Sequence, residues 1–149
     1  MSELFHYVDC GLPSIWLEGG VEVTETPYGS ATSIANLDGL HHEIAMDIIA
    51  SPHVMTGAEF RFIRIELDMS QRALADLIKT SVKNIQRWEK ERDAKVTGPA
   101  SVAVGLLYAA SRSDEKIHEL VKGLAALDRQ IVELEHHKFK LEGEHWAVA

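Results

Sequence analysis

The stretch LDMSQRALADLIKTSVKNIQRWEKER, from Leu67 to Arg92, contains two short helical patterns separated by a tight turn. Ser70 is the expected N-cap of the first helix, QRALADLI, and Ser81 that of the second, VKNIQRWEKER. Apolar residues recur at helical spacing within both segments. The stretch also holds six of the chain's fifteen Lys and Arg residues. The sequence therefore predicts a pair of helices on which positive charge is concentrated.

Charge is distributed unevenly along the whole chain, whose net charge is −8. Residues 1–55 contain eight acidic residues and no Lys or Arg. Residues 56–98 contain nine basic and seven acidic residues, and residues 99–149 contain six basic and eight acidic ones. Only the middle third can approach a polyanion without strong repulsion. This argues against a nonspecific nucleic-acid coat, but it is compatible with a localised DNA-binding face.

Length and composition set further bounds. The chain has 149 residues, 46% hydrophobic and 26% charged, which fits one ordinary domain or two small ones. No apolar run approaches the roughly 18 residues that a membrane span needs. The N-terminus has neither the basic region nor the apolar core of a signal peptide. A single cysteine, Cys10, excludes an internal disulfide, so we expect a cytoplasmic protein.

The first third has the pattern of short strands followed by a helix. FHYVDC is one candidate strand, and SIWLE and VEVTE alternate around Gly19-Gly20, which predicts a two-residue hairpin. SATSI is a further strand after the turn at 27–29. In DGLHHEIAMDIIA the apolar spacing changes to that of an amphipathic helix, with Asp38 as its expected N-cap and Pro52 as its stop.

The rest of the chain is predicted to be helical. Thr56 and Glu59 form a capping box for a helix that runs to about Leu67. Pro99 is expected at the first position of another helix. From about Ser113 we expect one long helix with a heptad stripe, which also includes Leu141 and has Lys138 in its one gap. We expect this stripe to form a homodimer, the alternative being that it packs on its own domain; its residues are Ile117, Leu120, Leu124, Leu127, Ile131 and Leu134.

Two helices joined by a tight turn, the second one basic, are typical of a helix-turn-helix. The segment resembles the Xre family of lambda-repressor-like domains, whose pattern reads S-Q-x-x-L-A-x-x-L-G-V-S-x-x-x-I-x-x-W-E-x-G. Ile78 matches this pattern conservatively, and the identical positions are Ser70, Gln71, Leu74, Ala75, Ser81, Ile85, Trp88 and Glu89. Trp88 is expected in the core rather than as a stacking platform.

The chain departs from the family pattern at two glycines. Lys79 stands where the family has the turn glycine, and a non-glycine with positive φ costs about 1 kcal/mol. Glu91 replaces the glycine after the Trp-Glu pair, so the second helix is expected to run further than usual.

The resemblance implies roles for residues of both helices. Gln71 is expected to contact a phosphate. Lys83 and Arg87 are expected to read guanine, Asn84 adenine or the backbone, and Val82 a thymine methyl. The full set of expected DNA-binding residues is Gln71, Arg72, Lys79, Ser81, Val82, Lys83, Asn84, Arg87, Lys90 and Arg92, with Lys95 as a further phosphate contact. Arg64 is expected to form a structural ion pair with Glu89.

A β-rich segment before such a domain resembles the MqsA-like antitoxins, whose N-terminal zinc site uses two C-x-x-C pairs. Cys10 stands alone here, so that site does not carry over, and we expect no metal and no cofactor. His6 with Cys10, or His41 with His42, are the remaining candidate ligands, although their spacing is not diagnostic.

Taken together, these patterns predict an α+β protein with three parts. They are a β-rich N-terminal domain with one helix at 1–54, which binds a partner or ligand, a helix-turn-helix domain at 55–111, and a dimerisation helix at 112–149. The expected function is a non-enzymatic, dimeric transcriptional regulator, a repressor that binds a pseudo-palindromic operator through the helix at 81–92. The alternatives are an antitoxin that neutralises a toxin and represses its own operon, or a protein-interaction module without DNA binding.

Overall fold

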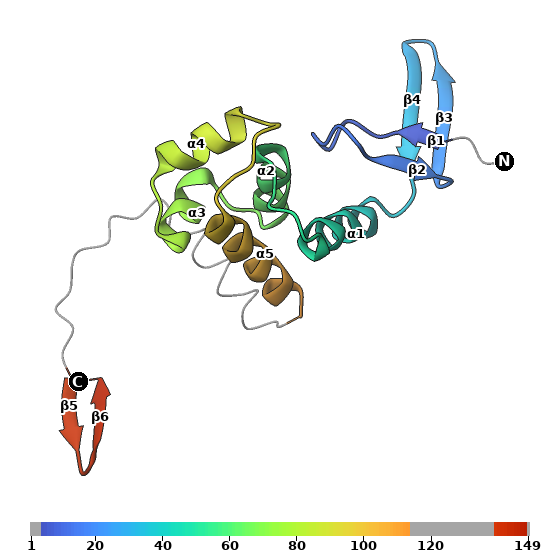
Figure 1. The fold of residues 1–149 in the computed structure, drawn as a ribbon. Helices are drawn as coiled ribbons and strands as arrows, with labels where there is room; N and C mark the ends of the chain where they lie inside the picture. Colours follow the sequence, from blue (N-terminus) through green and yellow to red (C-terminus); the bar gives the residue numbers. More distant parts are fainter. Residues whose placement is uncertain (1–3, 114–138, 149) are drawn as a thin grey trace.

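The computed structural model describes residues 4–113 and 139–148 and has an α+β architecture (Figure 1). Four short strands precede five helices, and a small hairpin follows near the C-terminus. The strands are β1 (Leu4–His6), β2 (Trp16–Glu18), β3 (Val21–Thr26), β4 (Gly29–Ile34), β5 (Phe139–Glu142) and β6 (His145–Val148). The helices are α1 (Leu37–Ala50), α2 (Gly57–Glu66), α3 (Gln71–Ile78), α4 (Val82–Lys90) and α5 (Gly98–Ser113).

The N-terminal strands form two separate antiparallel pairs rather than the hairpin predicted around Gly19-Gly20. β1 pairs with β2, with Phe5 opposite Leu17, and β3 pairs with β4. Both glycines have positive φ, as expected, but they connect one pair of strands to the other. The predicted pairing was wrong because Leu17 is buried in the core, and this burial places β2 beside β1.

Helix α1 begins earlier than predicted. Its N-cap is Asn36 and not Asp38, and the Asn36 side chain accepts a hydrogen bond from the Gly39 amide. Asn36 has φ 46°, a left-handed conformation that Asn tolerates better than most residues. Ile44, Ala45 and Ile48 are buried, which confirms the predicted apolar face.

Helix α2 has the predicted capping box. The Thr56 side chain accepts from the Glu59 amide, and the Glu59 carboxylate accepts from the Thr56 amide. Its first residue, Gly57, packs against the end of α4: a Cβ at this position would lie 1.8 Å from the carbonyl oxygen of Trp88. Glycine is therefore required where α2 meets α4, because any side chain would overlap the backbone.

Helices α3 and α4 are joined by the three residues 79–81. Ser70 and Ser81 cap the two helices, as predicted. Lys79 adopts the left-handed conformation with φ 61°, and both its own amide and that of Thr80 donate to the Ala75 carbonyl, which ends α3 tightly. Helix α4 ends at Lys90, so the predicted extension past Glu91 was wrong; Glu91 has φ −86° and needs no glycine.

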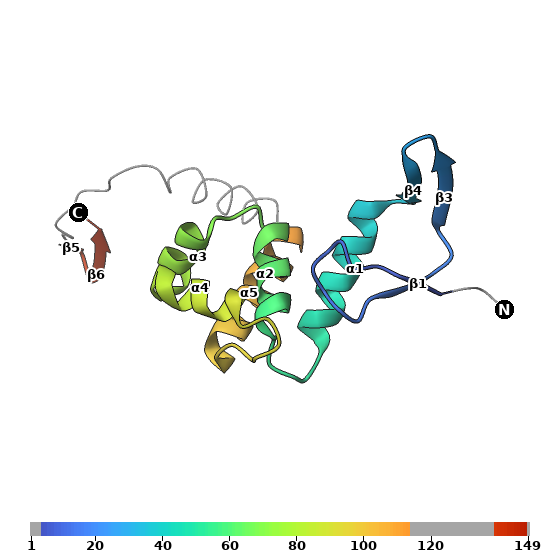
Figure 2. The ribbon, with the colours of Figure 1, turned by 90° about the horizontal axis from the view of Figure 1, so that it is seen from above.

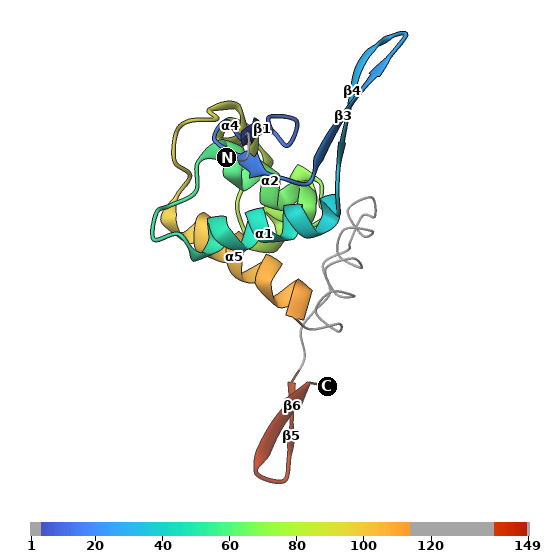
Figure 3. The ribbon, with the colours of Figure 1, turned by 90° about the vertical axis from the view of Figure 1, so that its right-hand side faces the viewer.

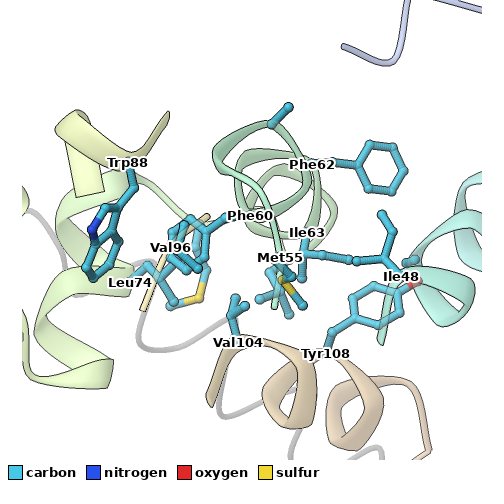
Figure 4. Packing of buried hydrophobic residues seen from close by; sticks show 14 of the residues in the cluster. Ile48, Met55, Phe60, Phe62, Ile63, Leu74, Trp88, Val96, Val104 and Tyr108 are labelled. Carbon is cyan, nitrogen blue, oxygen red and sulfur yellow. The ribbon is translucent and has the colours of Figure 1, made fainter. Parts of the chain in front are cut away.

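One hydrophobic core joins the N-terminal segment to the helices. Figure 4 shows part of this core, with Phe60, Leu74 and Val104 among the labelled side chains. Phe60, Ile63, Leu74, Ile85 and Val104 are fully buried, and the Trp88 ring packs edge-on against Phe60. The same cluster includes Tyr7, Leu12 and Leu17 from the N-terminal segment and the buried face of α1. The core therefore crosses the domain boundary predicted at 54/55.

Helix α5 begins at Gly98, one residue before the predicted start at Pro99, and contacts α1, α2 and α3. Most of the predicted dimerisation stripe, from Ile117 to Leu134, lies outside the described residues. Leu141, its last expected member, lies in the β5–β6 hairpin, where it is opposite Trp146. The prediction of one helix through residue 149 was therefore wrong for the segment 139–148.

Candidate nucleic-acid interface

Helix α4 has two chemically different faces. Ile85, Trp88 and Glu89 are buried against the other helices. On the opposite side Lys83, Arg87 and Lys90 are exposed, and their spacing of four and three residues places them on one stripe of the helix. We call these three residues the basic face of α4. Figures 1 and 2 show α3 and α4 at the opposite end of the molecule from β3 and β4, the acidic hairpin.

Two further cations lie close to this face along the chain. Arg72 is on the first turn of α3 and Lys79 is in the turn before α4, and both are exposed. Within residues 4–113 and 139–148, neither these two side chains nor the basic face of α4 forms an ion pair. Their charge is therefore not neutralised locally and is available to a polyanion.

The predicted ion pair between Arg64 and Glu89 is present and holds α4 against α2. The Arg64 guanidinium donates from Nε to Oε2 of Glu89 at 2.7 Å and from Nη2 to Oε1 at 2.8 Å. Its Nη1 donates to the Met69 carbonyl at 2.9 Å. The two side chains are only 13% and 5% exposed, so this bidentate pair lies inside the protein. It neutralises the one acid on the inner side of α4.

Three of the predicted DNA-binding side chains donate hydrogen bonds to groups within the protein. The Gln71 amide donates to Glu89 Oε1 at 3.2 Å, and the Asn84 amide donates to Thr80 Oγ1 at 3.0 Å. The Arg92 guanidinium donates to the Gly11 carbonyl, 81 residues away. Arg92 is therefore directed toward the N-terminal segment, whereas the side chains of Gln71 and Asn84 are half-buried at the starts of their helices.

The other predicted contacts vary in accessibility. Val82 is half-buried against the core, Ser81 is exposed but occupied as an N-cap, and Lys95 is exposed in the loop before α5. Two further polar residues, one on the exposed side of α4 and one on α2, were not predicted. Gln86 is exposed three residues after Lys83, a spacing that was visible in the sequence. Arg61 is 53% exposed and lies 3.8 Å from Glu89, a contact with no local sequence signal.

The candidate metal ligands are occupied by other partners. His41 bridges Tyr7, whose hydroxyl is 2.8 Å from Nε2, and Glu66, whose carboxylate is 2.8 Å from Nδ1. His42 pairs with the Tyr108 hydroxyl, and His6 with the Pro13 carbonyl. In the part of the chain that the structure describes, no three His, Cys, Asp or Glu side chains are grouped so as to hold a metal ion.

The two tyrosines of these pairs have shifted pKa values. Burial, followed by the charges of Cys10, Asp9 and Glu66, raises the pKa of Tyr7. Burial also raises the pKa of Tyr108, although Arg112 above its ring opposes the shift. Both phenols are therefore neutral hydrogen-bonding groups that tie α1 to its neighbours.

None of the described helices is both long and apolar enough to cross a membrane. Comparison of the chain with protein-family models, with curated proteins and with solved structures finds no match.

Proposed function

We propose that the protein is a sequence-specific DNA-binding regulator, a repressor that inserts α4 into the major groove. The single observation that carries the proposal is the basic face of α4: three exposed cations on one stripe of a helix whose opposite side is buried, none of which forms an ion pair with a described residue. An α-helix with its side chains is about 10–12 Å wide, and the major groove is about 12 Å wide. A helix presented in this way can therefore lie along base edges.

The proposed roles follow from side-chain chemistry. Lys83 and Arg87, near the start and middle of α4, donate to the O6 and N7 of guanine. Lys90, at the end of α4, and Arg72 and Lys79, beside it, contact phosphates and set the register of the helix on the duplex. Asn84 reaches adenine or the backbone only if its bond to Thr80 is exchanged.

The contacts that hold α4 in the protein support this proposal, because a DNA-recognition helix gains specificity when its orientation is fixed. Ser81 caps the helix, Gly57 lets α2 approach its last turn, and Arg64 grips Glu89 with two hydrogen bonds. Each of these contacts fixes the orientation of the helix in the protein without DNA. Less ordering entropy is then lost on binding.

Dimer formation is part of the proposal, because a repressor of this kind reads two half-sites about one helical turn apart. We assign dimerisation to the heptad stripe that begins at Ile117. Site selection tests the arrangement directly, since a dimer enriches an inverted repeat and a monomer enriches a single half-site.

The proposal is tested by selecting binding sites from random duplex DNA with the full-length protein and two variants. The wild type is expected to enrich one motif. Arg87→Ala is expected to relax the preference at one base pair, at a cost of about 1–3 kcal/mol. Lys140→Ala removes the same charge from an exposed lysine in β5 and serves as the matched control. Absence of enrichment by the wild type, or equal effects of both substitutions, would refute DNA reading by α4.

A protein-interaction role is the second candidate function, and the acidity of residues 1–55 favours it. An antitoxin would combine the two, with a toxin bound by the N-terminal segment and the operator by α4. If the selection finds no DNA motif while the N-terminal segment binds a protein, the interaction role alone stands.

A further inference from the structure

The β3–β4 hairpin projects from the body of the protein with most of its surface in solvent (Figures 1 and 3). Its turn is Pro27-Tyr28, where the Thr26 hydroxyl donates to the Gly29 carbonyl and accepts from the Tyr28 amide. Tyr28 at the tip is 98% exposed. Because a lone two-stranded hairpin is marginally stable in water, its open edges are suited to a further strand.

The register identifies which backbone groups are free. In an antiparallel pair, hydrogen-bonded and non-bonded residue pairs alternate. The Ala35 amide donates to the Gly20 carbonyl, so these two residues form a hydrogen-bonded pair at the base of the hairpin. The next pair toward the turn is therefore non-bonded, and every second pair after that one is also non-bonded, including Val23 opposite Thr32. The backbone groups of Val23 and Glu25 therefore point away from β4. In the described part of the chain β3 pairs with β4 alone, so this outer edge has no strand beside it.

A hollow lined by apolar side chains and by backbone lies beside the same strand. It has a volume of about 200 Å³ and is lined by Leu4, Phe5, Leu17, Gly19, Val21 and Val23. Val21 is half-buried at the base of the hairpin, whereas Val23 is 58% exposed at the rim of the hollow. A strand added along β3 would place every second side chain on this face, where an apolar residue would cover Val23.

The charge of the segment specifies the partner. Glu22 and Glu25 are exposed on β3, β4 has no charged residue, and residues 1–55 contain eight acids without a Lys or Arg. Like charges repel DNA and acidic proteins from this surface, whereas a basic protein is attracted. A strand beside β3 lies about 4.8 Å away, but a strand beside β4 would be about 10 Å from β3. The distance of about 10 Å exceeds the Debye length of about 8 Å at physiological salt, so a strand beside β4 would be largely screened from the glutamates of β3. A strand beside β3 would interact with them at short range.

We propose that the outer edge of β3 is the docking site for a basic protein, which adds an edge strand of alternating cationic and apolar residues. The cations of that strand lie on the face of Glu22 and pair with it, and its apolar residues lie on the other face and cover Val23 and the hollow. This site does not depend on DNA binding by α4. Figures 1 and 2 place the hairpin and α4 at opposite ends of the protein, so the two partners do not compete for one surface.

The test uses full-length ¹⁵N-labelled protein and a capped peptide of alternating lysine and valine, six residues long to match the six residues of β3. A peptide of alternating glutamate and valine is the charge control. The lysine peptide is expected to bind at least about tenfold more tightly, and its affinity is expected to fall as salt is raised. The largest amide shifts are expected at Val23 and Glu25.

Matched proline variants separate strand addition from general attraction. Val23→Pro and Thr32→Pro each remove an outward N–H from one edge, where proline is tolerated because that N–H makes no bond within the hairpin. Val23→Pro is expected to lower peptide affinity about tenfold or more, and Thr32→Pro to change it less than about twofold. Val23→Thr, which keeps both the N–H and the branched shape, is expected to retain most of the affinity. Circular dichroism checks that each variant folds.

Three results would overturn the proposal: equal binding of the lysine and glutamate peptides, equal effects of the two proline variants, or amide shifts that map away from β3. DNA site selection with Val23→Pro keeps the two proposals distinguishable, because this variant is expected to enrich the same motif as the wild type. Loss of the peptide with retention of the motif supports both proposals, whereas peptide binding without any motif leaves only the docking site.

Discussion

Replacing Glu89 with Gln tests whether the buried ion pair holds α4 in place. The substitution preserves the shape of the side chain but removes the charge that balances Arg64. The guanidinium keeps the Met69 carbonyl at 2.9 Å and one amide oxygen as acceptors, but its charge is no longer balanced in a position where 13% of the side chain is exposed. Breaking a buried pair by removing one partner costs about 3–5 kcal/mol, which is a large part of the 5–15 kcal/mol that stabilises a typical domain.

Urea unfolding followed by tryptophan fluorescence measures this cost, because Trp88, the residue before Glu89 on α4, is buried in the folded protein. Arg61→Ala is the matched control: Arg61 also faces Glu89, at 3.8 Å, but is 53% exposed, so its loss should cost less than about 1 kcal/mol. The double variant Arg64→Met/Glu89→Leu replaces both charges by apolar groups and should be close to neutral. If Glu89→Gln costs no more than Arg61→Ala, the buried pair does not hold α4.

Three other predictions concern a helix contact, the turn before α4 and a buried tyrosine. Gly57→Ala should destabilise the protein by about 3 kcal/mol or more, because its Cβ would overlap the Trp88 carbonyl, whereas Gly98→Ala, with no atom within 4 Å, should not destabilise it; thermal unfolding compares the two. Lys79→Gly should raise the free energy of unfolding by up to about 1 kcal/mol, because Lys79 has a φ of 61°, which glycine adopts without strain. The same substitution should weaken DNA binding because a cation is lost. A rise in both stability and DNA affinity would contradict the phosphate role of Lys79. The raised pKa of Tyr7 means that the folded protein favours the neutral phenol, which stabilises the fold. This stabilisation is complete below 10.0, the ordinary pKa of tyrosine, and is lost as the pH rises through the higher pKa of Tyr7 in the folded protein. Tyr7→Phe should therefore lessen the loss of stability above about pH 10, and an unchanged alkaline profile would contradict this assignment.

The elements that were predicted correctly depend on local contacts. The caps at Thr56, Ser70 and Ser81 are hydrogen bonds between residues three apart, so their signal lies within one turn of sequence. The pair between Arg64 and Glu89 spans 25 residues, and it was predicted only through the family resemblance. The positive φ at Lys79 followed from the same resemblance.

The errors concern contacts between distant segments. Gly19-Gly20 can form a hairpin turn, but burial of Leu17 pairs β2 with β1 instead. The contact of Arg92 with the Gly11 carbonyl spans 81 residues and has no local sequence signal, and Arg92 is exposed. At Leu141 the heptad spacing extended into a segment that forms a strand, because Leu141 also alternates with Phe139 at the two-residue spacing of a strand.

The central claim is that the basic face of α4 contacts DNA, and the salt dependence of binding to the selected site tests it most directly. Fluorescence anisotropy titrations measure the association constant K at several salt concentrations. Lys90→Ala should reduce the magnitude of the negative slope of log K against log salt by about one, while Lys140→Ala should leave this slope unchanged. Identical slopes for the wild type and Lys90→Ala, with identical affinities, would contradict contact between this face and DNA.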